Sequence, residues 1–178
     1  MLLQRVKLQL RPIPVKQLES NRLLLRNFQR QDLFDLGEML MDPDVVSHTG
    51  FRRPFSQEQV QEHLDDKIRQ SEVPFGVWGV WYKQDSKLVA WAMLKDTGES
   101  FMELGYMVNK NYWGKGIATE LSQMIINHAR DDLNLPAIMA RCDPNNSVSR
   151  RVLERRGFAL ESSSSVQCVY LLRLNDKD

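Results

Sequence analysis

Two closely spaced glycines near the middle of the chain have the pattern of a phosphate-binding turn. They are Gly114 and Gly116, and an apolar stripe at helical spacing begins directly after them at Ile117. The first turn of a helix leaves backbone N–H groups unpaired at the positive end of the helix dipole. Glycine lets an anion approach such groups closely, and Ala118 keeps the next position small. The segment therefore has the chemistry to bind a phosphate.

The same segment can also be interpreted as a strand-to-helix turn that merely uses glycine. Lys115 lies between the two glycines, whereas a Walker loop ends on a lysine followed by Ser or Thr. Thr119 stands where the dinucleotide fingerprint has its third glycine. Neither nucleotide motif is present, so this segment alone leaves both interpretations open.

A second stretch, residues 146–158, predicts a short basic helix with two well-defined ends. Asn146 is suited to cap its start, and Gly157 is suited to the left-handed residue that follows a helix. Ser149 falls in the first turn. Taken alone, these are the features of a surface helix.

Together the two stretches resemble the GCN5-related N-acetyltransferase (GNAT) family, and within it the RimJ/RimL branch that acetylates protein N-termini. The acyl-CoA motif of the family, Gln/Arg-x-x-Gly-x-Gly/Ala, is similar to residues 111–116, with Asn111 in the first place. The branch's Gly-Tyr and Tyr-Trp-Gly-Lys-Gly segments resemble residues 105–106 and 112–116. The family's Asn-x-x-Ser-x-Arg-Val-Leu-Glu-Lys-x-Gly-Phe signature resembles residues 146–158.

The resemblance implies that acetyl-CoA is the co-substrate and that no metal ion is needed. The pyrophosphate would lie on the N–H groups of residues 114–119, and the pantetheine arm would lie along the edge of a strand that splays away from its neighbour. An N–H near Met107 or Val108 would meet the thioester oxygen. The cofactor-binding residues implied in this way are Met107, Val108, Trp113, Gly114, Lys115, Gly116, Ile117, Ala118, Thr119, Asn146 and Ser149.

Two catalytic residues follow from the same resemblance. Glu103 is the best candidate for the base, because it precedes Met107 by four residues on one strand and so shares its face of the sheet. It could instead pair with an arginine or face solvent. Many family members carry a tyrosine as general acid where this chain has Leu153, and Ser149 could partly fill that role. Asn146 could bind the pantetheine amide or simply cap its helix.

The acceptor is expected to be a primary amine, and the resemblance to the RimJ/RimL branch implies a protein N-terminal α-amino group. A small-molecule amine (an amino acid, an aminoglycoside or a polyamine) is the main alternative, and a CoA-binding module without turnover is a third. The predicted acceptor loop is basic through Arg52 and Arg53, which argues modestly against polycations. His63 is predicted to lie on a solvated helix and is given no role.

Composition limits the other partners. Lys and Arg total 24 against 23 Asp and Glu, a net charge of +1, so nothing predicts binding to nucleic acid. No apolar stretch approaches the roughly 20 residues of a membrane span, and the two cysteines lack metal or redox spacing. We expect a cytoplasmic monomer or homodimer with reduced thiols.

The elements that would position these residues alternate along the chain. The patterns predict strands near residues 23–26, 75–82, 88–94, 102–108 and 136–141, with two more after residue 158, and helices over 31–41, 56–70, from 115 and from 147. This order predicts an α+β fold, which the resemblance narrows to a GNAT-type α/β/α sandwich around a mixed, largely antiparallel sheet. Residues 1–17 are predicted to be an extension, and 18–178 a single N-acetyltransferase domain.

Overall fold

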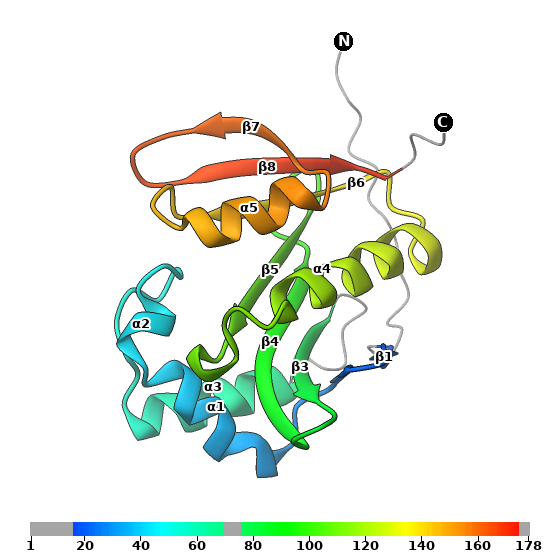
Figure 1. The fold of residues 1–178 in the computed structure, drawn as a ribbon. Helices are drawn as coiled ribbons and strands as arrows, with labels where there is room; N and C mark the ends of the chain where they lie inside the picture. The colour runs from blue at the N-terminus through cyan, green and yellow to red at the C-terminus, as the bar shows by residue number, and fades with distance from the viewer. Residues whose placement is uncertain (1–15, 70–75, 175–178) are drawn as a thin grey trace.

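One eight-stranded sheet forms the centre of the protein in a computed structural model, which describes residues 16–69 and 76–174 (Figure 1). The strands are β1 (Leu18–Glu19), β2 (Leu23–Arg26), β3 (Val77–Tyr82), β4 (Lys87–Lys95), β5 (Met102–Val108), β6 (Ala137–Cys142), β7 (Ala159–Ser163) and β8 (Cys168–Arg173). Their spatial order is β1-β2-β3-β4-β5-β6-β8-β7. Only β5 and β6 pair in parallel among these neighbours, and the remaining pairs are antiparallel. The predicted α+β fold with a mixed, largely antiparallel sheet is confirmed.

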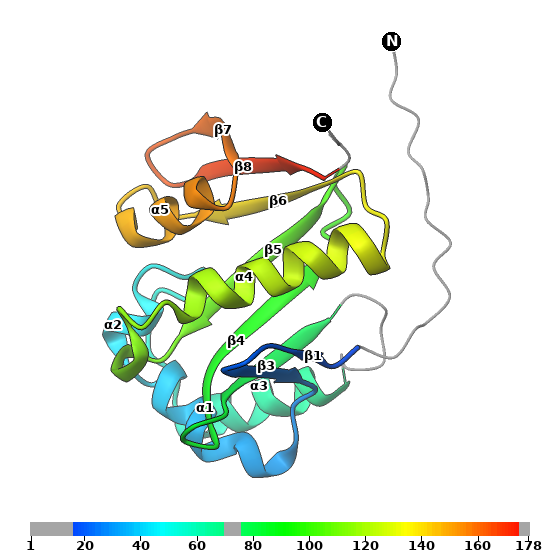
Figure 2. The ribbon, with the colours of Figure 1, turned by 45° about the vertical axis from the view of Figure 1, so that its right-hand side comes forward.

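Helices cover both faces of this sheet (Figure 2). They are α1 (Leu33–Leu40), α2 (Pro43–Val46), α3 (Gln57–Arg69), α4 (Ile117–Asn127) and α5 (Ser147–Arg155). Helices α4 and α5 pack on one face, in a buried cluster that includes Leu104 and Ile138. Helices α1, α2 and α3 pack on the other face, in a cluster that includes Trp91 and Met107. A side chain on β5 therefore points toward one helix layer or the other.

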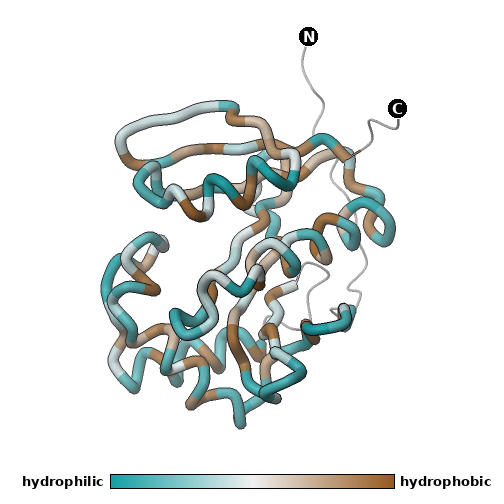
Figure 3. Tube along the Cα trace, in the orientation of Figure 1, coloured by the Kyte–Doolittle hydropathy of each residue, from teal (hydrophilic) through white to brown (hydrophobic). Residues whose placement is uncertain are grey.

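The central strands are rich in apolar residues because both of their faces are covered (Figure 3). Strand β3 is buried from Val77 to Trp81, and β4 from Leu88 to Ala92. Helix α4 instead buries a stripe at helical spacing, which includes Ile117, Leu121 and Ile125. The apolar runs and the helical stripe predicted these elements because such patterns reflect which side chains are buried.

Two short elements escaped the sequence patterns. Strand β1 has only two residues, and α2 has four, too few to show a period. Helix α2 depends on its cap, since the Asp42 carboxylate accepts hydrogen bonds from the N–H groups of Asp44 and Val45. The predicted extension 1–17 lies outside the described residues except for its last two, of which Lys16 forms an ion pair with Asp132.

Candidate active site

The sheet opens between β5 and β6. Their parallel pairing ends at Leu104 and Ala140, although β5 continues to Val108 and β6 to Cys142. The last residues of both strands therefore leave the ladder, as the resemblance implied. We call this opening the β5–β6 gap.

Strand alternation decides which backbone groups of β5 face the gap. The N–H of Asn109 donates to the Val89 carbonyl of β4 at 2.8 Å, so every second residue before it also turns its backbone toward β4. Met107 belongs to that set. Tyr106 and Val108 turn their N–H and carbonyl groups toward the gap. Of the two N–H groups that the sequence analysis offered for the thioester oxygen, that of Val108 faces the gap, whereas that of Met107 faces β4.

Trp113 lies over the end of the gap. Its side chain is 50% exposed, and its indole Nε1 donates a 2.8 Å hydrogen bond to the carbonyl of Val108. The indole therefore occupies the Val108 carbonyl and leaves the Val108 N–H facing the gap. This contact places Trp113 beside the predicted path of the pantetheine arm.

The turn before α4 has the conformation that an anion site needs. Gly114 and Gly116 have φ of 74° and 76°, in the left-handed region that favours glycine. The first helical hydrogen bond runs from the Glu120 N–H to the Gly116 carbonyl at 3.0 Å. The N–H groups of Ile117, Ala118 and Thr119 therefore lack helical partners, and no side chain caps this helix end. Residues 114–119, the phosphate cradle, fit the diphosphate of CoA.

Individual side chains of the cradle contribute differently. Ile117 is 1% exposed and belongs to the core, so only its backbone can meet a ligand. The Lys115 ammonium lies 4.4 Å from the centre of the Tyr112 ring, on the surface beside the cradle. The cradle thus offers an anion mainly backbone N–H groups, so the side chain of Asn111 in the first motif position matters less.

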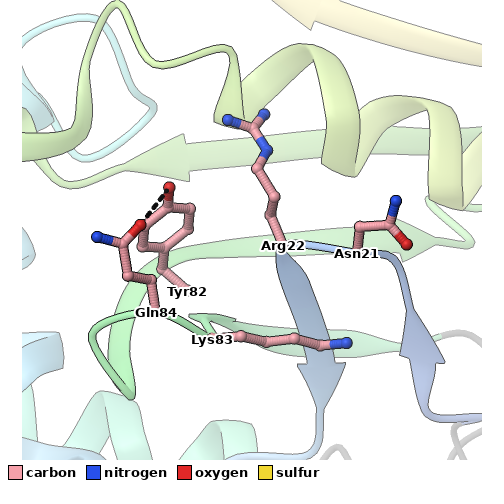
Figure 4. A pocket seen from close by; sticks show the side chains of 5 residues that line it. All are labelled: Asn21, Arg22, Tyr82, Lys83 and Gln84. Carbon is pink, nitrogen blue, oxygen red and sulfur yellow. Dashed lines mark hydrogen bonds between the residues drawn. The ribbon is translucent and has the colours of Figure 1, made fainter.

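Arg22, in the bend just before β2, braces the cradle, a role that the sequence analysis did not identify. It reaches up toward the start of α4 from a surface depression that it lines with Asn21, Tyr82, Lys83 and Gln84 (Figure 4). Its guanidinium donates to the Lys115 carbonyl at 3.0 Å and forms an ion pair with Glu120. This ion pair raises the pKa of Arg22 and offsets an acidic charge beside the anion site. The partners lie 93 residues apart, so no local pattern could have revealed them.

Glu103 lies where β5 and β6 begin to separate, one residue before Leu104. Its carboxylate is 14% exposed and accepts a hydrogen bond from the Arg141 guanidinium, which also pairs with Glu99. The arginine pairing weighed in the sequence analysis is therefore present. Glu103 remains partly accessible at the edge of the gap, on the face that carries α1, α2 and α3.

The start of α5 places Ser149 on the opposite face. The Asn146 side chain accepts the Ser149 N–H at 3.0 Å, so Asn146 has the capping role that was one of its two interpretations. The Ser149 hydroxyl lies 3.2 Å from the hydroxyl of Tyr106. Leu153 is 1% exposed in the core, so the usual position of the family's tyrosine carries no polar group. The Gly-Tyr segment drew attention to Tyr106 in the sequence, but it did not predict that this tyrosine contacts Ser149.

An aromatic cluster lies between α3 and β4, on the face of the sheet that also carries Glu103. The His63 ring packs at 5.4 Å against both Phe51 and Phe55 and at 6.4 Å from Trp91, measured between ring centroids. Burial lowers the pKa of His63 to about 4, so the ring is neutral at pH 7. Most of α3 faces water, as the sequence predicted, but the His63 ring lies on its inner side, among these aromatic side chains.

Among the residues that the structure describes, other reactive groups form no second centre. Burial raises the pKa of the Cys142 thiol to about 11, which keeps it protonated at neutral pH. No group of three or more His, Cys, Asp or Glu side chains that could bind a metal ion occurs in residues 16–69 and 76–174. In the same described segments, every helix is too short or too polar to cross a membrane.

Known proteins resemble this chain in sequence and fold. The profile of the acetyltransferase (GNAT) domain matches residues 22–159. The protein named uncharacterized N-acetyltransferase YnaD, from Bacillus subtilis, is 28% identical over 142 residues, which cover 80% of this chain and 82% of the relative.

Two solved structures illustrate the likeness of the fold. A GNAT-family acetyltransferase from Bacillus anthracis has a TM-score of 0.79 at 23% identity, over 90% of this chain and all of its own. RimL, a ribosomal L7/L12 α-N-protein acetyltransferase in complex with coenzyme A, has a TM-score of 0.77 at 15% identity, over 91% of this chain and all of its own. With the β5–β6 gap and the phosphate cradle in place, the matched domain identifies the chain as a member of the GNAT family of N-acetyltransferases, whose members use acetyl-CoA.

Proposed function

We propose that this N-acetyltransferase transfers the acetyl group of acetyl-CoA directly to the α-amino group of a protein or peptide N-terminus. The observation that carries the proposal is the β5–β6 gap, with Glu103 at its closed end and the phosphate cradle at its open end. A strand edge bounded in this way can take an extended pantetheine arm by main-chain pairing. The RimL likeness, which concerns the fold, supports an N-terminal acceptor.

Each residue has a separate task in this proposal. The cradle holds the diphosphate through its N–H groups, and the Val108 N–H donates to the thioester oxygen as negative charge develops there. Glu103 accepts the proton of the attacking amine, directly or through a water molecule. Ser149 donates a hydrogen bond to the departing sulfur.

Charges near Glu103 favour an acceptor with a single amine. Arg141 lies against the Glu103 carboxylate, and the Lys67 ammonium lies 5.3 Å from the centre of the Trp91 ring on the same face. His63 is neutral at pH 7, so it neither repels nor attracts a cationic acceptor. A polyamine or aminoglycoside needs several carboxylates to bind its several cations. A peptide N-terminus needs only one.

The test is a panel of acceptors incubated with the purified protein and acetyl-CoA, with products identified by mass spectrometry. We expect acetylation of peptides with free N-termini, and none of polyamines or aminoglycosides. Acetylation of polycations alone would refute the proposed acceptor. Binding of CoA without acetylation of any amine would favour a CoA-binding module.

The base is tested by a pair of isosteric substitutions on the two carboxylates that share Arg141. Glu103→Gln should lower kcat/KM by about 10²–10⁴-fold. Glu99→Gln removes the other partner of Arg141 and should leave the activity nearly unchanged. Equal activity of the two variants would show that Glu103 is not the base.

A further inference from the structure

A pair of hydroxyl groups joins the two sides of the β5–β6 gap. Tyr106 comes from β5, whereas Ser149 comes from the helix that follows β6, and their oxygens are 3.2 Å apart. Both side chains are only partly buried. The N–H and carbonyl groups of Tyr106 face the gap, so its side chain starts from a residue that borders the opening. Glu103 lies on the other face of the sheet, an odd number of residues away.

The phenol is suited to donate a hydrogen bond and not to lose its proton. Burial raises the pKa of Tyr106 to about 12, so the hydroxyl is protonated throughout the neutral range. The other titratable group near it is the Cys142 thiol on β6, which burial also keeps protonated. Tyr106 therefore has a proton to share with Ser149, and no neighbouring base competes for it among the described residues.

We propose that Tyr106 is a positioning residue that takes over part of the function vacated at Leu153: it donates to the Ser149 oxygen and so directs the Ser149 proton at the sulfur of CoA. This inference rests on the use of Ser149 in the proposed function. The family's usual acid position carries Leu153, which is buried and apolar. A hydroxyl from a strand and a hydroxyl from the start of α5 reach the gap in its place.

The step needs no further reactant. As the amine nitrogen bonds to the carbonyl carbon, its proton leaves through Glu103, and the C–S bond breaks with its electron pair on sulfur. The Ser149 O–H, polarised by Tyr106, donates a hydrogen bond to that developing thiolate. Ordinary thiols have a pKa of about 8.5, so the sulfur takes its final proton from water at neutral pH. Glu103 then returns its proton to the solvent, and Ser149 and Tyr106 end the cycle unchanged.

The first test compares Tyr106→Phe, Ser149→Ala and the double variant in acetylation of a peptide N-terminus. Tyr106→Phe keeps the ring and should lower kcat about tenfold, with the KM for acetyl-CoA nearly unchanged, because the lost hydrogen bond acts on the departing sulfur. Since Tyr106 acts through Ser149, the double variant should be no slower than Ser149→Ala. Additive losses, or full activity of Tyr106→Phe, would overturn the inference.

A matched control removes a hydroxyl behind the same helix. Tyr170 on β8 is fully buried, and its hydroxyl forms hydrogen bonds with Arg150 and Glu154 of α5 instead of Ser149. Tyr170→Phe removes these two hydrogen bonds to α5 and should change kcat by no more than about twofold, because neither bond reaches Ser149. A tenfold loss in this variant would mean that Tyr106 acts only by holding α5.

A second test does not depend on the acceptor. If the pair stabilises a thiolate, calorimetry should show that CoA binds more tightly at pH 9 than at pH 7, relative to desulfo-CoA, in which hydrogen replaces the thiol. Tyr106→Phe should abolish this difference. If peptides are not acetylated but the difference is present in the wild type and lost in the variant, the proposed acceptor fails and the role of Tyr106 stands. Absence of the difference in the wild type would refute that role.

Discussion

Gly116 offers a sharp test of the phosphate cradle, because its backbone conformation matters more than its surroundings. Its φ is 76°, and a Cβ placed there would lie 3.6 Å from the Arg22 Nη2, an ordinary contact. Gly116→Ala therefore adds left-handed strain of about 1–2 kcal/mol without a clash. For a chain of this size, each kcal/mol should lower Tm by about 2–4 °C.

Gly98 provides the matched control. It has the same φ of 76°, nothing lies within 4 Å of a Cβ placed there, and it lies in the turn between β4 and β5, at the opposite end of β5 from the cradle. Gly98→Ala should lose the same stability as Gly116→Ala. Only Gly116→Ala should also bind CoA about tenfold more weakly, or about 1.4 kcal/mol, because relief of the strain turns N–H groups away from the diphosphate.

The measurements are thermal unfolding and calorimetric titration with CoA. Equal losses of stability with a loss of CoA affinity confined to Gly116→Ala would support the cradle. Equal CoA affinities of the two variants would refute the reasoning, since backbone strain alone would then account for every effect of Gly116→Ala.

Three further predictions concern charges. Arg22→Gln should weaken CoA binding about tenfold, because the Glu120 carboxylate then has no cationic partner to offset its charge beside the diphosphate, and adding Glu120→Gln should restore part of the affinity in the same titration. Asp32→Ala should lower the free energy of unfolding by about 3 kcal/mol in urea, because it strands a largely buried Arg26 guanidinium that pairs with both carboxylate oxygens; an unchanged midpoint would contradict this. His63, with its folded pKa lowered to about 4, binds fewer protons folded than unfolded between pH 6.5 and 4, so stability should fall by roughly 1–3 kcal/mol as the pH drops through this range. His63→Phe should flatten this part of the pH profile, and an unaltered slope would assign it to other groups.

Elements with a clear period were predictable from the sequence. The stripe through Ile117, Leu121 and Ile125 predicted the buried face of α4 correctly, and apolar runs predicted β3 and β4. Helix α2 was missed, because four residues cannot show a helical period. The packing of the His63 ring was missed for a related reason: α3 is polar overall and only a narrow side of it is buried.

Backbone chemistry at the cofactor site was also within reach of the sequence. The two glycines needed a left-handed conformation and adopt it, and Asn146 caps α5 as its type and position predicted. The Val108 N–H could not be separated from that of Met107, because strand alternation gives the period but not which residues face the gap. The hydrogen bond from Asn109 to β4 decides it.

The sequence by itself determined the local features of this protein: the turn at Gly114 and Gly116, the helix ends, and the order of strands and helices that identifies the fold. These depend on residues within a few positions of one another, so a single stretch of sequence contains their cause. Only the tertiary structure decided the side-chain partners. Arg141 meets Glu103 across 38 residues, and Ser149 meets Tyr106 across 43. Such pairs follow from strand register and from where two strands part, which long-range packing sets and no local pattern records.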